Sequence, residues 1–536
     1  MSLQTRITEL VQAIAADIRD LRTRDGIGNV KAFGAKGDGT TNDTVAVQAA
    51  INASSIVYFP PGTYLCGALT HTAKTELRGV RGRSIIKAAS TLTTAQALLS
   101  NSGAAYVDTD LRLDGLVFDG SNLGKNDASQ TRLQALVRYT KASRVRVTRC
   151  HFRDYGYQLL GMRSCRDVLV WSCEVSGAGY AGTTANGGSA IWANQSDADL
   201  GRNIRVVDCY VHDNEWHGLH IGGMGAQVLN NTFENNKETH VFSTMQRGGA
   251  NPALVTRDLV VSGNICRGLK RKDISAHGLE LQCWGGLVSN NVVAECEHGG
   301  IAVERSRDVT VVGNTIRQFG TNPPTGGAYG GIDIYCTGTG TAATAHVNVS
   351  NNVIGMDAES GLNVAGIRVL NPGGDIPSNV TIHDNVLTGG AFTAGKIVKT
   401  AWDPTNCRHW NNRGAGDDRP YNGTLTVSAT GVVTISGIPF TPQWVQITAF
   451  VTSTTAAQIS LATLVAQVGT VGGVAYAVDG TNARASGPAA LQAVVIKTPT
   501  GTDIAVGALD SFTADGFRIN FTALTAPVVV RFTAHP

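Results

Sequence analysis

The feature that most constrains this chain is a two-part repeat in its middle. The clearest copy begins with Gly278-Leu-Glu-Leu281, an apolar strand pattern with one carboxylate, and continues through Gly286-Leu-Val-Ser-Asn-Asn-Val-Val293. The first half recurs as Gly218-Leu-His-Ile221, Gly300-Ile-Ala-Val303, Gly331-Ile-Asp-Ile334 and Gly366-Ile-Arg-Val369. The second half ends at Asn231, Asn264, Asn291, Asn314, Asn352, Asn385 and Asn412. These asparagines lie 33, 27, 23, 38, 33 and 27 residues apart. A motif that stays the same while its spacing varies predicts stacked turns of one winding chain, with insertions at one corner.

The composition agrees with a β-structure rich in tight turns. The chain has 536 residues, of which 63 are Gly, 16% are charged and 6% are aromatic. A formal net charge of +3 provides no basic field for nucleic acid. No apolar run approaches the roughly 20 residues that span a bilayer, and the first residues lack a secretory-signal pattern. We therefore expect neither nucleic-acid binding nor membrane insertion.

The asparagines and some cysteines share one position in the repeat. Cys150, Cys173 and Cys209 stand where Asn stands later, which favours small buried thiols over disulfides or a metal site. We expect production in a reducing cytosol, and no metal or cofactor. The asparagines are expected at a corner with positive φ. Their amides would then hydrogen-bond from turn to turn, in a structural role.

Residues 3–21 carry a heptad pattern, with apolar residues at Leu3, Ile7, Leu10, Ile14 and Leu21. This predicts a short coiled-coil helix of two or three strands. A single amphipathic helix packed on the body is the alternative. The pattern ends in Arg22-Thr-Arg-Asp-Gly26, so residues 1–27 are assigned to an N-terminal oligomerisation segment.

The segment after this helix is Val30-Lys-Ala-Phe-Gly-Ala-Lys-Gly-Asp-Gly-Thr-Thr-Asn-Asp-Thr44, continuing to Ile51, and then Val57-Tyr-Phe-Pro-Pro-Gly-Thr-Tyr64. It predicts a strand, a Gly-rich turn, a helix capped by Asn42, Asp43 or Thr44, and a second strand. No Gly-Lys-Ser/Thr follows the glycines, which excludes a phosphate loop. The segment resembles the opening motif of the pectate-lyase-like superfamily, which includes polygalacturonases and phage tailspike depolymerases. That resemblance implies a helix that covers the first turn of a right-handed parallel β-helix.

We therefore predict an all-β chain in three parts. Residues 28–413 would form the β-helix catalytic domain, with 28–110 as its opening and capping part. Residues 414–536 lose the repeat and alternate Thr, Val and Ala, as in Val528-Val-Val-Arg-Phe-Thr533. This favours a separate C-terminal antiparallel β-sandwich. It resembles C-terminal domains of phage tail proteins, which implies trimerisation or glycan binding.

Aligning the repeats predicts which side chains face outward, because neighbouring strand residues point to opposite faces. The leucines of Gly278-Leu-Glu-Leu281 would face inward and Glu280 outward. The first outward row reads, turn by turn, Gln158, Trp192, His220, Phe242, Glu280, Ala302, Asp333 and Arg368. A second row, two residues further along, reads Leu160, Asn194, Gly222, Thr244, Gln282, Glu304, Tyr335 and Leu370. We predict Trp192, His220, Phe242, Tyr335 and Arg368 to bind substrate.

Three acids in these rows are the candidate catalytic residues. Turns lie about 4.8 Å apart and alternate residues about 6.7 Å apart. Glu280 and Glu304 are thus roughly 8 Å apart, as are Glu304 and Asp333, while Glu280 and Asp333 lie about 9.5 Å apart. Inverting glycosidases hold their two carboxyl groups about 6.5–9.5 Å apart. We predict Glu280 as general acid and either Asp333 or Glu304 as base. All three are expected to be exposed, and at least one pKa should be raised.

The resemblance to tailspikes implies a polysaccharide depolymerase. Its expected substrate is a bacterial surface polysaccharide: capsule, exopolysaccharide or O-antigen. The protein is expected to be a homotrimer in the virion tail, attached to other tail proteins by its N-terminus, assembled in the host cytoplasm and acting outside the cell. Some tailspikes place the site between subunits, so this location stays open.

The sequence leaves several alternatives open. A polysaccharide lyase would need a base and a cation, for which Tyr335, Arg368 and His220 are candidates. A non-catalytic receptor-binding fibre would need no acid pair at all. Asp213 and Glu215 are second-choice catalysts, and Lys270-Arg-Lys272 is either a solvated turn or an attraction for acidic polysaccharide.

Overall fold

The computed structural model describes most of the chain. The described residues are 4, 7–8, 11–14, 26–93, 95–123, 135–179, 189–193, 201–243, 255–269, 276–320, 329–337, 343–356, 364–372, 374–389, 392, 394–400, 406–414, 421–438, 444–451, 459–467, 470–479, 482–486, 492–497, 503–513 and 516–535. The chain divides into two units, residues 1–381 with 385–407, and residues 382–384 with 408–536.

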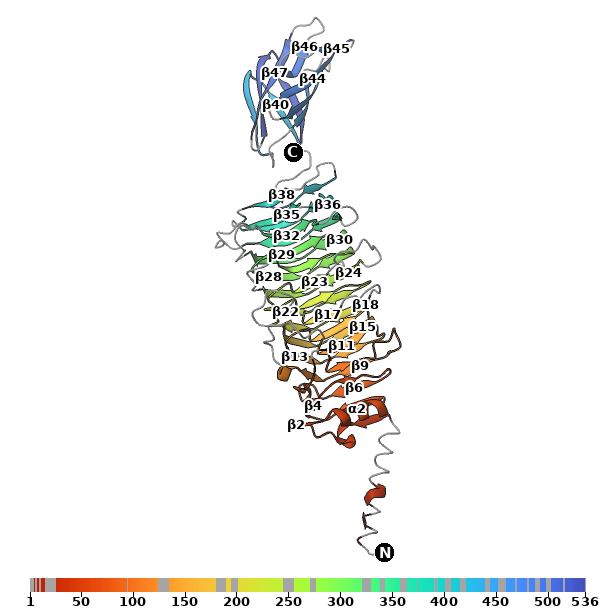
Figure 1. Ribbon diagram of the computed structural model, residues 1–536. Helices are drawn as coiled ribbons and strands as arrows, with labels where there is room; N and C mark the ends of the chain where they lie inside the picture. The colour runs from red at the N-terminus through yellow and green to blue at the C-terminus, as the bar shows by residue number, and fades with distance from the viewer. Residues whose placement is uncertain are drawn as a thin grey trace. The chain divides into compact units, whose positions relative to one another are not determined.

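The first unit is a parallel β-helix whose strands stack in three long sheets (Figure 1). Each turn of the chain adds one strand to sheet A, one to sheet B and one to sheet C. Every strand therefore pairs with the equivalent strand one turn earlier and one turn later, in parallel register. The predicted solenoid is confirmed.

Sheet A consists, in order, of β1 (Ile27–Asn29), β3 (Ile56–Phe59), β6 (Glu76–Gly79), β9 (Arg112–Asp114), β12 (Arg146–Thr148), β15 (Arg166–Trp171), β18 (Arg202–Val207), β21 (Gln227–Leu229), β24 (Arg257–Ser262), β27 (Trp284–Ser289), β30 (Arg307–Val312), β33 (Ala345–Ser350), β36 (Ser378–His383) and β39 (Arg408–Trp410).

Sheet B consists of β2 (Asp38–Asn42), β4 (Gly62–Cys66), β7 (Ser84–Ala88), β10 (Val117–Asp119), β13 (His151–Tyr155), β16 (Glu174–Ala178), β19 (Tyr210–His212), β22 (Thr232–Glu234), β25 (Ile265–Leu269), β28 (Val292–Cys296), β31 (Thr315–Phe319), β34 (Val353–Gly355) and β37 (Val386–Thr388).

Sheet C consists of β5 (Leu69–Thr70), β8 (Leu99–Ser100), β11 (Val137–Thr140), β14 (Leu160–Arg163), β17 (Ile191–Ala193), β20 (Leu219–Ile221), β23 (Val241–Ser243), β26 (His277–Leu281), β29 (Gly299–Glu304), β32 (Tyr329–Tyr335), β35 (Val364–Leu370) and β38 (Gly395–Lys399).

The glycine that opens each repeat sits where the interior has no room for a side chain. A Cβ added at Gly278 would lie 2.4 Å from Val293 Cγ1, and one at Gly331 would lie 2.5 Å from Ile354 Cγ2. Both neighbours are buried core residues of sheet B. Glycine therefore lets the first residues of a sheet C strand pass close to sheet B, which explains why the repeat begins with it.

The asparagine ladder is confirmed at the corner between sheets A and B. Asn264 Oδ1 accepts hydrogen bonds from the backbone N of Asn231 at 2.9 Å and from its side-chain Nδ2 at 3.0 Å. The same pair of bonds links each following turn through Asn291, Asn314, Asn352 and Asn385. These amides are buried and bonded to the backbone and to one another, so their role is structural.

One detail of the ladder prediction was wrong. The residue with positive φ is the one before each ladder asparagine, for example Asn230 at 55° and Asn290 at 55°, or Gly263 at 70°. The turn thus uses the first residue of each Asn-Asn or Gly-Asn pair for its backbone conformation. The second residue supplies the amide.

The cysteines behave as predicted where they replace the ladder asparagines. Cys150, Cys173 and Cys209 are free and buried. The Sγ of Cys209 donates to the carbonyl oxygen of Val207. Its backbone N donates to Asn231 Oδ1 at 2.9 Å. This bond joins the last of the three cysteines to the first asparagine of the ladder.

The opening helix is α2 (Thr44–Ala53), and it packs on the first strands of the β-helix (Figure 1). Val47, Ala50 and Ile51 are buried, and the N-cap is Asp43, one of the three expected capping residues. The Asp43 carboxylate accepts from the backbone N of Lys36 at 2.7 Å and of Gly37 at 2.9 Å, which fixes the Gly-rich turn against the helix. Two short 3-10 helices are η1 (Val30–Phe33) and η2 (Ser121–Leu123).

The second unit is an antiparallel β-sandwich, as predicted. Its strands, after β39 (Arg408–Trp410), are β40 (Tyr421–Val427), β41 (Gly431–Ile435), β42 (Trp444–Val451), β43 (Ile459–Gln467), β44 (Thr470–Asp479), β45 (Asn482–Ser486), β46 (Gln492–Lys497), β47 (Asp503–Thr513), β48 (Gly516–Leu524) and β49 (Val528–His535). One sheet runs β40-β49-β42-β43-β44-β45 and the other β41-β48-β47-β46. Val445, Ile447 and Val530 of the first sheet meet Ile519 and Phe521 of the second in a common core.

The predicted heptad helix lies largely outside the described residues. Residues 4, 7–8 and 11–14 are helical, and Ile7, Val11 and Ile14 are exposed. Oligomerisation through this segment stays a prediction. Among the described residues, no helix is long and apolar enough to cross a membrane.

Candidate functional site

The outward face of sheet C carries the candidate site. Pairing between strands places Trp192, His220, Phe242, Glu280, Ala302, Asp333 and Arg368 in one row across seven turns. This is the first predicted row, except that Gly161 and not Gln158 pairs with Trp192. The second row is also correct where Glu304 pairs with Tyr335 and Tyr335 with Leu370.

One end of the row is an aromatic surface. The ring centroids of Trp192 and His220 are 4.2 Å apart, and those of His220 and Phe242 are 4.9 Å apart. His217 stacks on Phe242 from the preceding corner, with centroids 4.7 Å apart. Trp192 and Phe242 are half-buried, so part of each ring reaches solvent. Such a surface can stack on the apolar face of a sugar ring.

His220 contributes to that surface as a neutral ring. Burial lowers the pKa of His220 to about 3, and 6% of the residue is exposed. An imidazole with so low a pKa is a weak proton acceptor. A lining role therefore fits His220 better than the role of a base.

Asp333 is buried, and the expectation that it is exposed was wrong. Its carboxylate accepts from Arg368 Nε at 2.6 Å and Nη2 at 2.7 Å, from His277 Nε2 at 2.9 Å, and from the backbone N of Gly330 at 3.2 Å. Burial opposes ionisation, but the bonds from Arg368 and His277 outweigh it and lower the pKa of Asp333 to about 2. The expectation of a raised pKa is thus also wrong for Asp333. It remains an anion at ordinary pH and bridges three strands.

The hydrogen bonds to Asp333 also hold the side chain of Arg368 in place. Its guanidinium is turned onto Asp333 in a bidentate pair, 8% of the residue is exposed, and its charge centre lies 5.9 Å from the ring of Tyr329. A guanidinium neutralised in this way is a poor cation for a substrate carboxylate. The predicted contact between Arg368 and substrate stays a prediction, and the geometry favours a positioning role.

Glu304 is buried as well, which corrects the second exposure prediction. Its carboxylate accepts from Gln282 Nε2 at 2.7 Å and from Thr337 Oγ1, and Arg305 Nε lies 3.5 Å away. Exposure of the residue is 6%. These donors fix the orientation of Glu304, and its carboxylate retains further lone pairs.

Glu280 is the one acid of the three that is half-buried rather than buried. It follows Phe242 in the row, and Ala302 next to it adds only a methyl group. The nearby Tyr335 is also half-buried. Burial, then the negative charges of Glu280 and Glu304, raise the pKa of Tyr335 far above its usual value. Tyr335 is therefore a protonated phenol that can donate a hydrogen bond to a ligand.

The alternation of inward and outward residues along the strand did not predict that His277 belongs to the site. Because Gly278 and Leu279 both face the interior, the strict two-residue period fails at that point. His277 consequently joins the outward cluster one residue out of phase. Tyr329 belongs to the same cluster: its ring stacks on His298, with centroids 5.0 Å apart. The sequence signal for this break in the two-residue period was the glycine pair at the start of the sheet C strands in the following turns.

The second-choice acids lie at the other corner, between sheets B and C. Asp213 bonds His212 Nδ1 at 2.7 Å and Glu215 bonds Lys237 Nζ at 2.6 Å, both near the surface. The segment Lys270-Arg-Lys272 lies outside the described residues, as do Asn194 and Thr244. Within the described part of the chain, no group of three or more His, Cys, Asp or Glu side chains is placed to hold a metal ion.

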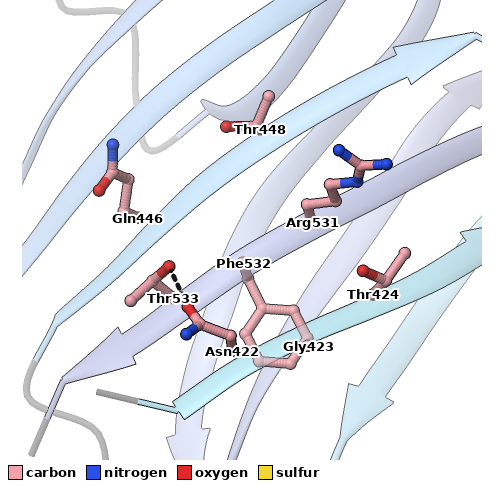
Figure 2. A pocket seen from close by; sticks show the side chains of 8 residues that line it. All are labelled: Asn422, Gly423, Thr424, Gln446, Thr448, Arg531, Phe532 and Thr533. Atoms are coloured by element: carbon pink, nitrogen blue, oxygen red, sulfur yellow. Dashed lines mark hydrogen bonds between the residues drawn. The ribbon is translucent and has the colours of Figure 1, made fainter. Parts of the chain in front are cut away.

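A second concave surface lies on the outer face of the C-terminal sandwich (Figure 2). It has a volume of about 440 Å³, and its lining includes Asn422, Thr424, Gln446, Thr448, Arg531 and Thr533. Thr533 Oγ1 donates to Asn422 Oδ1 at 2.6 Å. Amides, hydroxyls and one guanidinium suit sugar hydroxyl groups, so glycan binding by this domain stays a prediction.

Comparison with known proteins supports the fold. The model of the family "Rhamnogalacturonase A/epimerase, pectate lyase-like" matches residues 27–211, and the model "Right handed beta helix region" matches residues 253–405. The preneck appendage protein of Bacillus phage PZA is 25% identical over 202 residues, which are 34% of this chain and 23% of that protein. The chain thus spans less than a quarter of the length of that relative.

Two solved structures share the architecture. One is the A-module of the mannuronan C-5 epimerase AlgE6 of Azotobacter vinelandii, with 20% identity and a TM-score of 0.51, covering 72% of this chain and 98% of that chain. The other is PfbA, a surface adhesin of Streptococcus pneumoniae, with 15% identity and a TM-score of 0.52, covering 86% and 98%. At these identities the likeness concerns the fold alone. One of the two is an enzyme and the other an adhesin.

Proposed function

We propose that the chain is a phage tailspike-type depolymerase of the pectate-lyase-like superfamily of right-handed parallel β-helices, a proposal supported by the two family models that match residues 27–211 and 253–405. Its substrate would be a bacterial surface polysaccharide, cleaved by glycoside hydrolysis. The similarity to a preneck appendage protein of a Bacillus phage supports a place in the virion tail, and a role in host attachment belongs to the same proposal. Homotrimer formation, with attachment to other tail proteins through residues 1–27, belongs to the same proposal.

The observation that carries the proposal is the sequence of side chains along sheet C. An aromatic surface of Trp192 and Phe242 leads directly to Glu280, which has the greatest access to solvent of the three candidate acids. A sugar chain lying across the turns would contact the rings first and bring a glycosidic bond to the carboxyl group. Stacking would supply binding, and Glu280 would supply the proton.

We assign Glu280 as general acid and prefer Glu304 over Asp333 as the base. Glu304 lies one turn and two residues from Glu280, which corresponds to roughly 8 Å between Cα atoms and leaves space for a water molecule. Asp333 is a weaker candidate because a carboxylate with a pKa of about 2 attracts a proton poorly. We assign it instead to holding His277 and Arg368 in place.

The lyase alternative is less well supported by the same side chains. It requires a group that abstracts a proton next to a uronate and a cation that neutralises the uronate carboxylate. Tyr335 holds its proton too strongly, and the pKa of His220 is about 3. Arg368 is already paired with Asp333. None of the three predicted residues therefore meets a lyase requirement well.

The test is to incubate the purified protein with a panel of bacterial capsules, exopolysaccharides and O-antigens. Hydrolysis predicts a fall in polymer length together with new reducing ends that lack the ultraviolet absorbance of unsaturated uronates. An absorbing product would support the lyase instead. Polymers that bind and keep their length would support a receptor-binding fibre and overturn the enzymatic proposal.

A further inference from the structure

A groove on sheet A, separate from the candidate site on sheet C, gathers arginines from three successive turns. We call it the arginine groove; it has a volume of about 400 Å³ and is lined by Glu76, Arg78, Arg112, Leu113, Asp114, Arg146, Thr148 and Arg149. Strands β6, β9 and β12 provide these residues in adjacent turns. Four arginines and two acids leave an excess of two positive charges. The candidate site contributes no residue to it.

The two acids of the groove are already paired. Glu76 accepts from Arg78 Nε at 2.8 Å. Asp114 accepts from Thr148 Oγ1 at 2.7 Å and from Arg149, on the edge of the next turn. Burial opposes ionisation of Asp114, but these bonds prevail and lower its pKa. Both carboxylates are therefore engaged, Glu76 with Arg78 and Asp114 with Arg149, although Glu76 also occupies the position paired with Arg112 on the preceding turn.

Those remaining arginines are neighbours on adjacent strands. Arg112 and Arg146 occupy directly paired positions on β9 and β12, which places their Cα atoms about 4.8 Å apart. Arg146 Nη1 donates to the carbonyl oxygens of Val145 and Asp167, and no ion pair of Arg112 or Arg146 is found within the described residues. Like charges in directly paired positions repel. An anion lying between the two guanidinium groups would relieve that repulsion.

An exposed aromatic ring stands beside this pair. Trp171 pairs with Thr148 on the next turn, and 41% of it is exposed. Its Nε1 donates to Asp208 Oδ2 at 2.9 Å, which fixes the orientation of the indole. Trp171 lies one turn and two residues from Arg146, or roughly 8 Å between Cα atoms. A sugar ring on the indole would direct a carboxylate on that ring toward the two guanidinium groups.

We propose that the arginine groove and Trp171 together form a second binding site, for an acidic polysaccharide. A carboxylate of the polymer lies between Arg112 and Arg146, and a neighbouring sugar stacks on Trp171. The site holds the polymer without cleaving it. It raises the local concentration of polymer around the β-helix, and it acts whether or not sheet C is catalytic.

The test measures binding of polygalacturonate, a carboxylate polymer, and of neutral dextran to the full-length protein by titration calorimetry at about 0.15 M salt. The wild-type protein should bind polygalacturonate and not dextran. Arg112→Gln should weaken this binding about tenfold, because hydrogen bonds between charged groups are lost. Trp171→Ala should weaken it several-fold through loss of stacking. Arg317→Gln is the matched control, because Arg317 is also exposed on a β-helix strand but in sheet B.

Three results would overturn the proposal. The wild-type protein could fail to bind polygalacturonate, or Arg317→Gln could weaken binding as much as Arg112→Gln, which would indicate unspecific attraction. Arg112→Gln could instead change the oligomeric state in light scattering, which would make the groove a contact between copies of this chain. Binding that depends on Arg112 in a protein that cleaves no polymer would leave this site intact and contradict only the depolymerase proposal.

Discussion

The corner between sheets A and B and the outward face of sheet C use polar side chains in opposite ways. At the corner, an asparagine in the equivalent position of each turn, from Asn231 to Asn385, makes the same hydrogen bonds to its neighbour. On sheet C each turn presents a different side chain, and the buried charges bridge several strands. The first arrangement propagates the fold. The second interrupts the repeat. A solenoid acquires a specific surface where successive turns present different side chains.

The largest effect should come from Asp333→Asn. The substitution leaves the Arg368 guanidinium buried without its anion, a loss that typically costs about 3–5 kcal/mol. We expect the free energy of unfolding of the β-helix to fall by that amount in urea titration. Asp308→Asn is the control, because Asp308 is exposed and has positive φ, which Asn tolerates. Equal stability of the two variants would mean that the charge cluster is not structural.

A smaller loss is expected in the ladder. Asn291→Ala removes the acceptor of the buried backbone N–H of Asn264, along with two donor bonds of the amide, at a cost of about 2–3 kcal/mol. Its neighbour provides the contrast: Asn290→Gly should be almost neutral, because glycine accepts the φ of 55°. Similar effects at both positions would contradict the division of roles within the pair.

Acid should destabilise the β-helix through its buried histidines. Burial lowers the pKa of His220 and His240 to about 3, and of His71 to about 4, from 6.5. The unfolded chain therefore takes up protons that the folded chain refuses, and stability falls as pH drops from about 6.5 toward 3. At pH 5 each of these three histidines costs about 2 kcal/mol relative to neutral pH.

The variant His220→Phe sharpens this prediction, since it removes one of those histidines. The loss of unfolding free energy between pH 7 and pH 5 should shrink by about 2 kcal/mol compared with wild type. His346→Asn, at an exposed position with positive φ, should leave that loss unchanged. An identical pH dependence in both variants would refute the assignment of His220.

The smallest effect is expected at the aromatic surface. Phe242→Ala should raise KM several-fold with little change in kcat, because stacking contributes about 1 kcal/mol to binding and is uniform along the reaction. Leu287→Ala is the control, on the exposed face of sheet A. A loss confined to kcat would place Phe242 at the reacting bond.

The sequence predicted the fold well because the repeat determines the backbone. Matching the repeats was enough to place Trp192, Phe242, Glu280 and Asp333 in one row, since the inward and outward faces alternate. The alternation of inward and outward residues could not predict how deeply an outward side chain is buried. Asp333 faces outward and is nevertheless buried, because His277, one residue out of phase, and Arg368, from the next turn, close over it.

The arginine groove was missed for a different reason. The repeat is most regular in sheet C, whereas Arg112 and Arg146 lie in its early turns, before the asparagine ladder begins at Asn231. Their pairing depends on register between β9 and β12, which no motif marks. Register is set by the turns between sheets, so it becomes visible only in the structure.

The most direct test of the central claim is the activity of Glu280→Gln on a polysaccharide that the wild-type protein cleaves. The account predicts that kcat/KM falls on the order of 10³-fold, or about 4 kcal/mol of transition-state stabilisation. The free energy of unfolding should change by less than about 0.5 kcal/mol. Glu295→Gln, at an exposed glutamate on sheet B, should retain full activity. Cleavage by Glu280→Gln at the wild-type rate would contradict the assignment of sheet C as the catalytic face.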